Sequence, residues 1–399
     1  MGNETRSERR VTDPSTTRSL GSLDTAWDVI VIGAGPAGVL SSILALRNGW
    51  KTLLVEAKHF PRAKVCGGCL NGRAQQVLED HGLLDLILEA GAVPLHGFQL
   101  VQGKQRGHWG LPNMLSISRS TMDDRLVRRA RDEGVEVSMG TTATIGAIEE
   151  DRRRVLLSRG HEKVSVCGSV IVAASGLVSS CLSGFTELES HVAPGARIGV
   201  GAVMARPSSP LYASSDLWMA VGKEGYVGMA PVESDQWNVA AALDSRSIRE
   251  RGSIGDVIVD LLEQCQLPIP DNMGSVTWTG TPALTRQRMR VAMERLFLVG
   301  DATGYVEPFT GEGMAWALLE ADRLGPWVDA GCREWKPSFE AEWQRCMEIE
   351  VRKRQWFCRG LTQILRSPWL SNVALRTTRW FPGVADRAIR YVVGSESTS

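Results

Sequence analysis

Short apolar runs separated by glycine-rich turns mark the front of the chain as βαβ structure. Residues 29–32 form a continuous apolar run, which is typical of a parallel strand buried on both faces. A helical pattern follows over about 36–47 and stops at an Asn-Gly pair, a common helix end. A second predicted strand over 51–55 ends at Glu56. The pattern predicts a strand, a helix and a second strand in one parallel unit.

A second region of this kind lies near the other end of the chain. Residues 296–299 form an apolar run that ends at Gly300 and Asp301, and a Gly-Glu-Gly segment then precedes a helical pattern over about 314–324. Between about 185 and 284 the pattern differs, because short runs alternate with Pro and Gly turns. That alternation predicts an antiparallel sheet between the two parallel regions.

The turn after the first strand carries the spacing G-x-G-x-x-G. In such a turn the first glycine allows a tight bend, the second lets a pyrophosphate approach the backbone, and the third lets helix and strand pack closely. The helix N-terminus adds free amides and a partial positive charge. Glu56 is placed to accept hydrogen bonds from ribose hydroxyls and would repel a 2′-phosphate, which favours FAD or NAD over NADP. The alternative is a glycine-rich turn in an unrelated α/β protein. The residues expected to bind the dinucleotide here are Gly33, Ala34, Gly35, Pro36, Ala37, Gly38, Glu56 and Ala57.

The second parallel region decides between the two dinucleotides. An Asp at a strand end, here Asp301, can bond a polyol chain such as the ribityl group of FAD. A helix N-terminus at Gly313 could face the flavin pyrimidine ring, where its dipole would stabilise the charge of reduced flavin near N1. NAD has neither group, so the sequence favours FAD. The residues expected at this end are Gly300, Asp301, Gly311, Gly313 and Met314.

Composition narrows the class further. The 399 residues include 45 basic and 45 acidic ones, which gives no sign of nucleic-acid binding. Eight cysteines on a long chain without an apolar signal segment indicate reduced thiols and a cytoplasmic location. No run of about 18 apolar residues occurs, so no transmembrane helix is expected.

These motifs resemble those of the FAD-dependent oxidoreductases that include geranylgeranyl reductases and aromatic-ring hydroxylases of the p-hydroxybenzoate hydroxylase type. The resemblance covers roughly 26–330 and rests on "VIGAGPAG" with Glu56 and on "LVGDATGYVEPFTGEGM". "ISRSTMDDRLVRRA" matches a family element in which an arginine, here Arg119, contacts FAD. That stretch is also typical of an ordinary amphipathic helix beginning at Ser118 or Ser120.

Within this resemblance a reductase is favoured over a hydroxylase. Many ring hydroxylases carry a His where this chain has Gly304, and an Asn where it has Ala315. "EPFTGEGM" and "FPRAKVCGG" look more like segments of geranylgeranyl reductases, and the Trp-x-Trp-x-Ile-Pro segment of flavin halogenases is missing. The resemblance implies flavin contacts at Lys64, Cys66, Gly67 and Gly68.

The pair Cys66 and Cys69 in "CGGC" admits several roles. By the resemblance, the Cys66 thiol would face the flavin, where it could donate a proton to carbon as hydride leaves the flavin, or it could only shape the site. A redox pair with Cys69 is less favoured, because a thioredoxin-type pair opens a helix with varied residues between the thiols. Zinc would need two further ligands, so no metal site is expected. Glu307 and Glu312 are acid–base candidates by position alone.

One departure from the family concerns the electron donor. The family often carries an Asp-Gly pair in a segment like "ADGxxS", whereas this chain has Ser175 before Gly176. In the family that segment helps to bind the FAD pyrophosphate and NAD(P)H. The donor therefore stays open between NAD(P)H and an electron-donor protein such as ferredoxin or another reduced flavin.

The substrate side and the tail give weaker signals. "GYVGMAPV" resembles the reductase segment that closes over the substrate, which makes Tyr226, Met229 and Pro231 candidate pocket residues, although core packing explains them equally. Residues 352–394 contain nine Lys or Arg, one acid and interleaved tryptophans. They predict either peripheral contact with an anionic membrane or helices packed on the body of the protein.

Together these features predict an α/β protein, α+β overall, with a Rossmann-type FAD-binding domain, an inserted antiparallel substrate domain and a helical C-terminal region. The expected activity is hydride transfer from reduced flavin to a C=C bond of a lipophilic substrate, prenyl or polyketide-like. The alternatives are a flavin monooxygenase that hydroxylates an aromatic or polyketide substrate, and a non-catalytic flavin-binding electron carrier. The expected boundaries are 1–25 for a disordered leader, 26–75, 115–180 and 285–330 for the FAD-binding domain, 76–114 and 181–284 for the substrate domain, and 331–399 for the C-terminal region.

Overall fold

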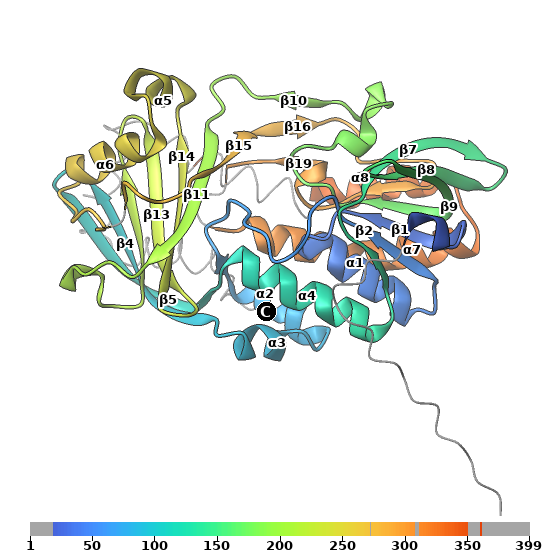
Figure 1. The fold of residues 1–399 in the computed structure, drawn as a ribbon, viewed down its shortest axis with the longest axis horizontal. Helices are drawn as coiled ribbons and strands as arrows, with labels where there is room; N and C mark the ends of the chain where they lie inside the picture. Colours follow the sequence, from blue (N-terminus) through green and yellow to red (C-terminus); the bar gives the residue numbers. More distant parts are fainter. Residues whose placement is uncertain (1–18, 272, 308–310, 350–359, 361–399) are drawn as a thin grey trace, which may run out of the picture.

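The computed structural model describes residues 19–271, 273–307, 311–349 and 360. Two eight-stranded sheets lie side by side, and helices pack against the first of them (Figure 1). A small sheet of β10 (Ser190–Val192), β16 (Arg286–Arg288) and β19 (Gly304–Tyr305) runs along the top of the view between the two large ones. The predicted α/β class is confirmed.

The first sheet has the order β17-β18-β9-β1-β2-β6, and the hairpin β7–β8 joins it through β9. Its central pairs are parallel, because long crossovers rather than hairpins connect the paired strands. The last four residues of β1 are buried, as the continuous apolar run predicts. The strands are β1 (Ala26–Ile32), β2 (Thr52–Val55), β6 (Glu136–Ser138), β7 (Thr142–Glu149), β8 (Arg152–Arg159), β9 (Glu162–Ala173), β17 (Ala292–Met293) and β18 (Leu296–Leu298).

The helices of this unit begin and end close to where the sequence predicts. Helix α1 has the predicted bounds. Helix α7 continues past the predicted end at 324, because buried residues on later turns, Val328 and Gly331, extend its apolar face. The helices are α1 (Pro36–Arg47), α2 (Gly72–Asp80), α3 (Leu84–Glu89), α4 (Arg119–Glu133), α7 (Gly313–Arg333) and α8 (Ser338–Met347).

The second sheet has the order β15-β11-β14-β13-β12-β4-β5-β3. It is antiparallel, as predicted, except where β12 pairs in parallel with β4. That pair is parallel because the chain visits the first sheet between the two strands and returns by a crossover. The elements are β3 (Cys69–Leu70), β4 (Val93–Gln102), β5 (Gln105–Ser116), β11 (Ile198–Ala205), β12 (Asp216–Val221), β13 (Gly225–Val232), β14 (Gln236–Leu243), β15 (Thr279–Ala283), α5 (Ser245–Arg251) and α6 (Ile254–Gln264).

Alternation along the central strands of this sheet separates two faces. Trp218, Val227 and Met229 join an outer core with helix α6, whereas Met219 and Tyr226 belong to a separate cluster on the opposite face. Successive side chains of a strand point to opposite faces, so the second group faces the first unit. The candidacy of Met229 as a pocket residue is therefore wrong.

Two expected boundaries do not match the packing. The predicted disordered leader reaches residue 25, yet Leu20 is fully buried in the first core and its N–H donates to Glu162 at 2.7 Å. The expectation of disorder is wrong for 19–25, because two leucines there fill the core. The expected substrate segment 76–114 is split between the units: its helical part packs in the first core, whereas β4 and β5 lie in the second sheet.

Helix α8 packs on the first core through Trp343, whose side chain is buried against Phe297. The basic aromatic stretch over 352–394, with its two predicted roles, lies outside the described residues. Among the helices that are described, none has the length and apolar character needed to cross a bilayer. In the same part of the chain, no three His, Cys, Asp or Glu side chains gather as metal ligands would.

Candidate flavin site

A cavity that is partly open to solvent lies between the strand ends of the first sheet and the inner face of the second. Glycine-rich turns and charged groups form one end of its wall, and apolar side chains form the other. The predicted cofactor residues that line it are Gly35, Pro36, Ala37, Lys64, Cys66, Gly67, Arg119, Gly300, Asp301, Gly311, Gly313 and Met314. The predicted residues not among its lining are Gly33, Ala34, Gly38, Glu56, Ala57 and Gly68.

Arg119, the first residue of helix α4, dominates the charged end. Its guanidinium donates two hydrogen bonds to Asp123, at 2.8 and 2.7 Å, and both side chains are buried. Burial alone would lower the pKa of Arg119, but the Asp123 carboxylate outweighs it and raises that pKa, so the guanidinium keeps its charge. Ser118 caps the helix and fixes where Arg119 begins it.

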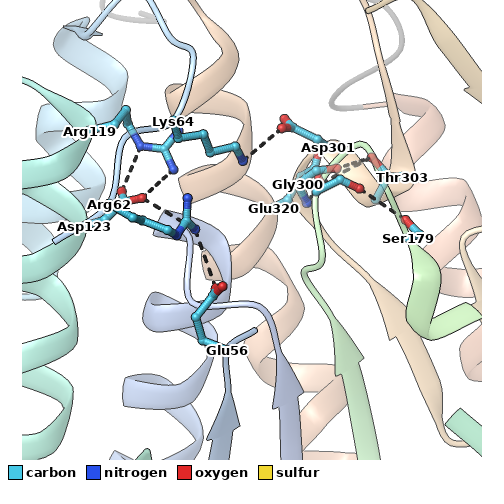
Figure 2. Close-up of polar contacts among 11 residues, drawn as sticks. Glu56, Arg62, Lys64, Arg119, Asp123, Ser179, Gly300, Asp301, Thr303 and Glu320 are labelled. Atoms are coloured by element: carbon cyan, nitrogen blue, oxygen red, sulfur yellow. Dashed lines mark hydrogen bonds and ion pairs between the residues drawn. The ribbon is translucent and has the colours of Figure 1, made fainter. Parts of the chain in front are cut away.

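Glu56 and Arg62 continue this polar network towards α1 (Figure 2). One carboxylate oxygen of Glu56 accepts the Ala34 N–H at 2.8 Å, and the other accepts the Lys58 N–H at 2.9 Å. Arg62 lies 3.5 Å from Glu56 and 3.9 Å from Asp123. An ionised carboxylate has about four acceptor sites, so Glu56 retains capacity for ribose hydroxyls.

Gly300 and Asp301 form a turn that a buried acid holds in place. The Gly300 N–H donates to Glu320 at 2.6 Å, and the Thr303 hydroxyl lies 3.5 Å from the same oxygen. Burial raises the pKa of Glu320 well above its ordinary range, which favours the protonated form of this side chain. Asp301 faces the cavity, where the Lys64 ammonium lies 3.4 Å from its carboxylate (Figure 2).

The CGGC turn runs along the cavity wall on a fixed backbone. Asn238 of the second sheet donates to the Cys66 carbonyl at 2.8 Å. Gly68 has a φ of 75°, and a Cβ there would lie 2.9 Å from the Ile117 carbonyl oxygen. Only glycine fits such a bend. The turn thus presents the partly exposed Cys66 and Gly67 to the cavity.

Cys69 also lines the cavity but is more deeply buried than Cys66. Desolvation by burial, together with the neighbouring Cys66, raises the pKa of the Cys69 thiol to about 12. The thiolate is the reactive form of cysteine, so Cys69 is unreactive near neutral pH and a redox pair with Cys66 is disfavoured.

We therefore expect iodoacetamide at pH 8 to alkylate Cys66 at least about tenfold faster than Cys69 in the folded protein. The rate at Cys69 should rise only as the pH approaches its raised pKa of about 12. Mass spectrometry of Cys66→Ser and Cys69→Ser variants resolves the two sites, and urea-unfolded protein serves as the control, in which both should react alike. Equal rates in the folded protein, or a Cys66–Cys69 disulfide after air exposure, would contradict this assignment.

The apolar end of the cavity is a row of side chains on adjacent strands of the second sheet. Strand pairing places Met219 beside Gly228 and Gly228 beside Ala240, and all three line the cavity. The next row brings Tyr226 beside Ala242. The small residues in the middle of the row, Gly228 and Ala240, leave space above the sheet and form the floor of the cavity. The larger residues form its sides.

Tyr305 of β19 adds a polar group to this end. It lines the cavity and packs with Tyr226 and Leu284. Burial raises its pKa well above the ordinary tyrosine value, so the phenol remains a hydrogen-bond donor at working pH.

Several residues of the site had no individual signal in the sequence. Asp123 could have been found from its spacing of four residues after Arg119 on a helix. Glu320, Tyr305 and Asn238 owe their places to contacts across long sequence separations, which no local pattern indicates.

The two other acids suggested by position are held in ion pairs. Glu307 lies 3.3 Å from Arg197, and Glu312 lies 3.7 Å from Arg73. Both acids are buried, and neither is among the residues that line the cavity. Their surroundings favour a structural role over acid–base chemistry.

The geometry fits FAD on three counts. A Cβ added at Gly35 would meet no atom within 4 Å except Arg119 Nη2, at 3.7 Å, so the backbone there is open to a ligand. The N-termini of α1 and α7 both reach the cavity and favour an anionic group. The cation of Arg119 and the carboxylate of Asp301, which both line the cavity, match a diphosphate followed by ribityl hydroxyls, whereas Glu56 lies outside the lining and accepts the Ala34 N–H.

The chain belongs to the FAD binding domain family, whose model matches residues 26–333. It is thus a flavoenzyme of the FAD-dependent oxidoreductase and monooxygenase class, and the predicted superfamily is confirmed. One relative is the menaquinone reductase of Mycobacterium tuberculosis, 28% identical over 331 residues, or 76% of each chain. Another is digeranylgeranylglycerophospholipid reductase 3 of Methanosphaera stadtmanae, 27% identical over 315 residues, which are 73% of this chain and 74% of the relative.

Among solved structures, the chain is similar to a flavin-dependent brominase. The TM-score is 0.76 at 19% identity, and the match covers 93% of this chain and 94% of the brominase. At that identity the likeness establishes the fold alone.

Proposed function

We propose that this protein is an FAD-dependent reductase that saturates a carbon–carbon double bond of a lipophilic substrate, prenyl or polyketide-like. The observation that carries the proposal is one cavity whose charged end is built from FAD motifs and whose other end is apolar. The names of the two relatives, reductases of menaquinone and of a digeranylgeranyl lipid, agree with it.

Each part of the cavity wall has a role in this proposal. Arg119 and the N-terminus of α1 bind the diphosphate, and Glu56 and Asp301 accept hydrogen bonds from sugar and ribityl hydroxyls. Bound FAD, in its reduced form, supplies hydride. The apolar row around Met219 and Gly228 excludes water and holds the hydrocarbon part of the substrate.

Cys66 is the candidate proton donor. It lines the cavity, and its carbonyl accepts a hydrogen bond from Asn238. A donor at this place can protonate the carbon next to the one that receives hydride.

A departure from the family pattern at Ser175 bears on the source of electrons. Its hydroxyl accepts from the Cys181 thiol at 3.3 Å, so an uncharged group stands where relatives often carry Asp. We infer that a donor other than NAD(P)H, an electron-donor protein or a reduced flavin, is the more effective reductant. NAD(P)H remains the comparison in the experiment.

The test is anaerobic turnover with geranylgeraniol as the lipophilic probe. Protein loaded with FAD is reduced with NADPH, NADH or dithionite, and the flavin absorbance is followed while mass spectrometry detects a gain of two hydrogen atoms per double bond. Gly228→Leu is the matched control, because it fills the apolar row and should keep the flavin spectrum while turnover falls.

The alternative activities give different results. Oxygen consumption coupled to a hydroxylated product from an aromatic probe would make the protein a monooxygenase. Bound FAD that a donor reduces, with no product from either probe, would favour an electron carrier.

A further inference from the structure

Lys64 lines the cavity next to Asp301 of the second FAD motif. It comes from the loop between β2 and β3, and it lines the cavity together with Cys66 and Asp301. Its side chain is 30% exposed, and its ammonium lies 3.4 Å from Asp301. A Cβ added at Gly176 would lie 3.5 Å from the same ammonium. The cation is thus placed between the ribityl-binding turn, the CGGC turn and the end of strand β9.

The other cationic side chains of this region are paired with carboxylates. Arg119 makes two short hydrogen bonds to Asp123, and Arg62 lies between Glu56 and Asp123. Lys64 has one carboxylate within 4 Å among the described residues, Asp301, at a distance long for a charged hydrogen bond.

The strand end near Lys64 adds no second carboxylate. The residue before Gly176 there is Ser175 rather than an acid, and its hydroxyl accepts a hydrogen bond from the Cys181 thiol. The charge of Lys64 is therefore only weakly neutralised and is free to act on a ligand in the cavity. Partial burial strengthens such an interaction relative to water.

We propose that Lys64 sets the reduction potential of the bound flavin: its ammonium stabilises the reduced, negatively charged form more than the neutral oxidised form. This rests on the FAD site but not on the proposed substrate or reaction. A cation placed beforehand where charge develops stabilises that charge without reorganisation. The Asp301 carboxylate disfavours the gain of negative charge by the flavin, and the Lys64 ammonium offsets this effect of Asp301.

A simple anchoring role predicts a different outcome. The diphosphate of FAD carries the same charge in both redox states. If Lys64 only held that group, its removal would weaken the binding of oxidised and reduced FAD equally, and the potential would not change. If Lys64 acts on the flavin ring, its removal weakens the binding of reduced FAD more than that of oxidised FAD. The reduction potential then falls by an amount set by the difference between the two losses.

The experiment compares Lys64→Met with Lys64→Arg and with Lys58→Met, which removes an exposed lysine of the same loop. The midpoint potential is measured by anaerobic reduction against a reference dye, and the affinity for oxidised FAD is measured by fluorescence with apoprotein. No substrate is needed, so failure of the proposed reaction does not affect the result.

We expect Lys64→Met to lower the ratio of reduced to oxidised flavin at a fixed potential about tenfold, which is about 30 mV for a two-electron couple. Lys64→Arg should recover most of the shift, and Lys58→Met should show none. An unchanged potential in Lys64→Met would overturn the proposal. So would complete loss of FAD from Lys64→Met while Lys64→Arg stays loaded, because that is the behaviour of a diphosphate anchor.

Discussion

Gly38→Ala is expected to unfold the FAD-binding unit. A Cβ at this position would lie 1.8 Å from the carbonyl oxygen of Gly33 and 3.1 Å from Ala174 Cβ. The first of these is backbone, held in the turn between β1 and α1, so it cannot move without breaking that turn. We expect a loss of about 3 kcal/mol or more in the free energy of unfolding, and protein that purifies without flavin. Urea denaturation followed by circular dichroism gives the stability, and absorbance gives the flavin content.

Gly35→Ala, three residues earlier, should separate cofactor binding from folding. Gly35 has φ −77° and ψ 178°, a conformation that alanine adopts freely. A Cβ there would meet only Arg119 Nη2, at 3.7 Å, an ordinary contact with a side chain. The methyl group would project into the cavity where we place the diphosphate. We expect wild-type stability of the apoprotein and an affinity for FAD about tenfold to a hundredfold lower, or about 1.4–2.8 kcal/mol.

The control for both variants is Gly110→Ala in strand β5, an exposed position where an added Cβ meets nothing within 4 Å. Alanine should stabilise that strand by about 0.5–1 kcal/mol and leave FAD binding unchanged. If Gly38→Ala folds and binds FAD, the close packing of α1 on the first sheet is not required. If Gly35→Ala binds FAD as tightly as the wild type, the diphosphate does not pass over this glycine.

These glycines also show how much of the site could be predicted from the sequence. Their spacing predicts a bend, an open backbone and a close contact, and each role corresponds to an atom that an added methyl group would or would not meet. Such roles are local, since they depend on residues within one turn. The bounds of α1 and the burial of β1 could be predicted for the same reason.

The parts that could not be predicted depend on the packing of distant segments. Asn238 reaches the Cys66 carbonyl across 172 positions of sequence. Glu233, at the end of β13, accepts the N–H and hydroxyl of Ser118 at the start of α4. Neither residue has a motif, because its partner is set by how the two sheets dock. The sequence did not show which face of β13 lies towards the cavity, because both faces are buried, one by α6 and the other by the first unit.

Together these two contacts connect the apolar floor to the charged end. The hairpin of β13 and β14 carries Gly228 and Ala240 on the floor, and its turn region holds both the CGGC turn and the cap of α4. The second sheet therefore positions groups of the FAD site through a few hydrogen bonds. A shift of this hairpin would move Cys66 and Arg119 together.

Arg119→Met is expected both to destabilise the protein and to weaken FAD binding, and the two effects can be separated. Asp123 is fully buried, and Arg119 supplies its two short hydrogen bonds. Removing one partner of a buried ion pair costs about 3–5 kcal/mol, because a buried charge is left uncompensated. Arg62, 3.9 Å from Asp123, compensates only part of this loss, so we expect the lower end of that range by urea denaturation of apoprotein.

The double variant Arg119→Met/Asp123→Leu removes both charges. Replacing a buried pair by apolar side chains is often neutral, so its stability should return to within about 1 kcal/mol of the wild type. FAD affinity should not return, because the cation beside Gly35 is gone in both variants. Asp123→Asn gives the opposite pattern: the apoprotein is weakened, but Arg119 keeps its charge for the diphosphate, and saturating FAD restores much of the stability by mass action. If the double variant recovered both stability and FAD affinity, Arg119 would be a structural partner of Asp123 alone, and the anion contact at this end of the cavity would have to come from the N-terminus of α1.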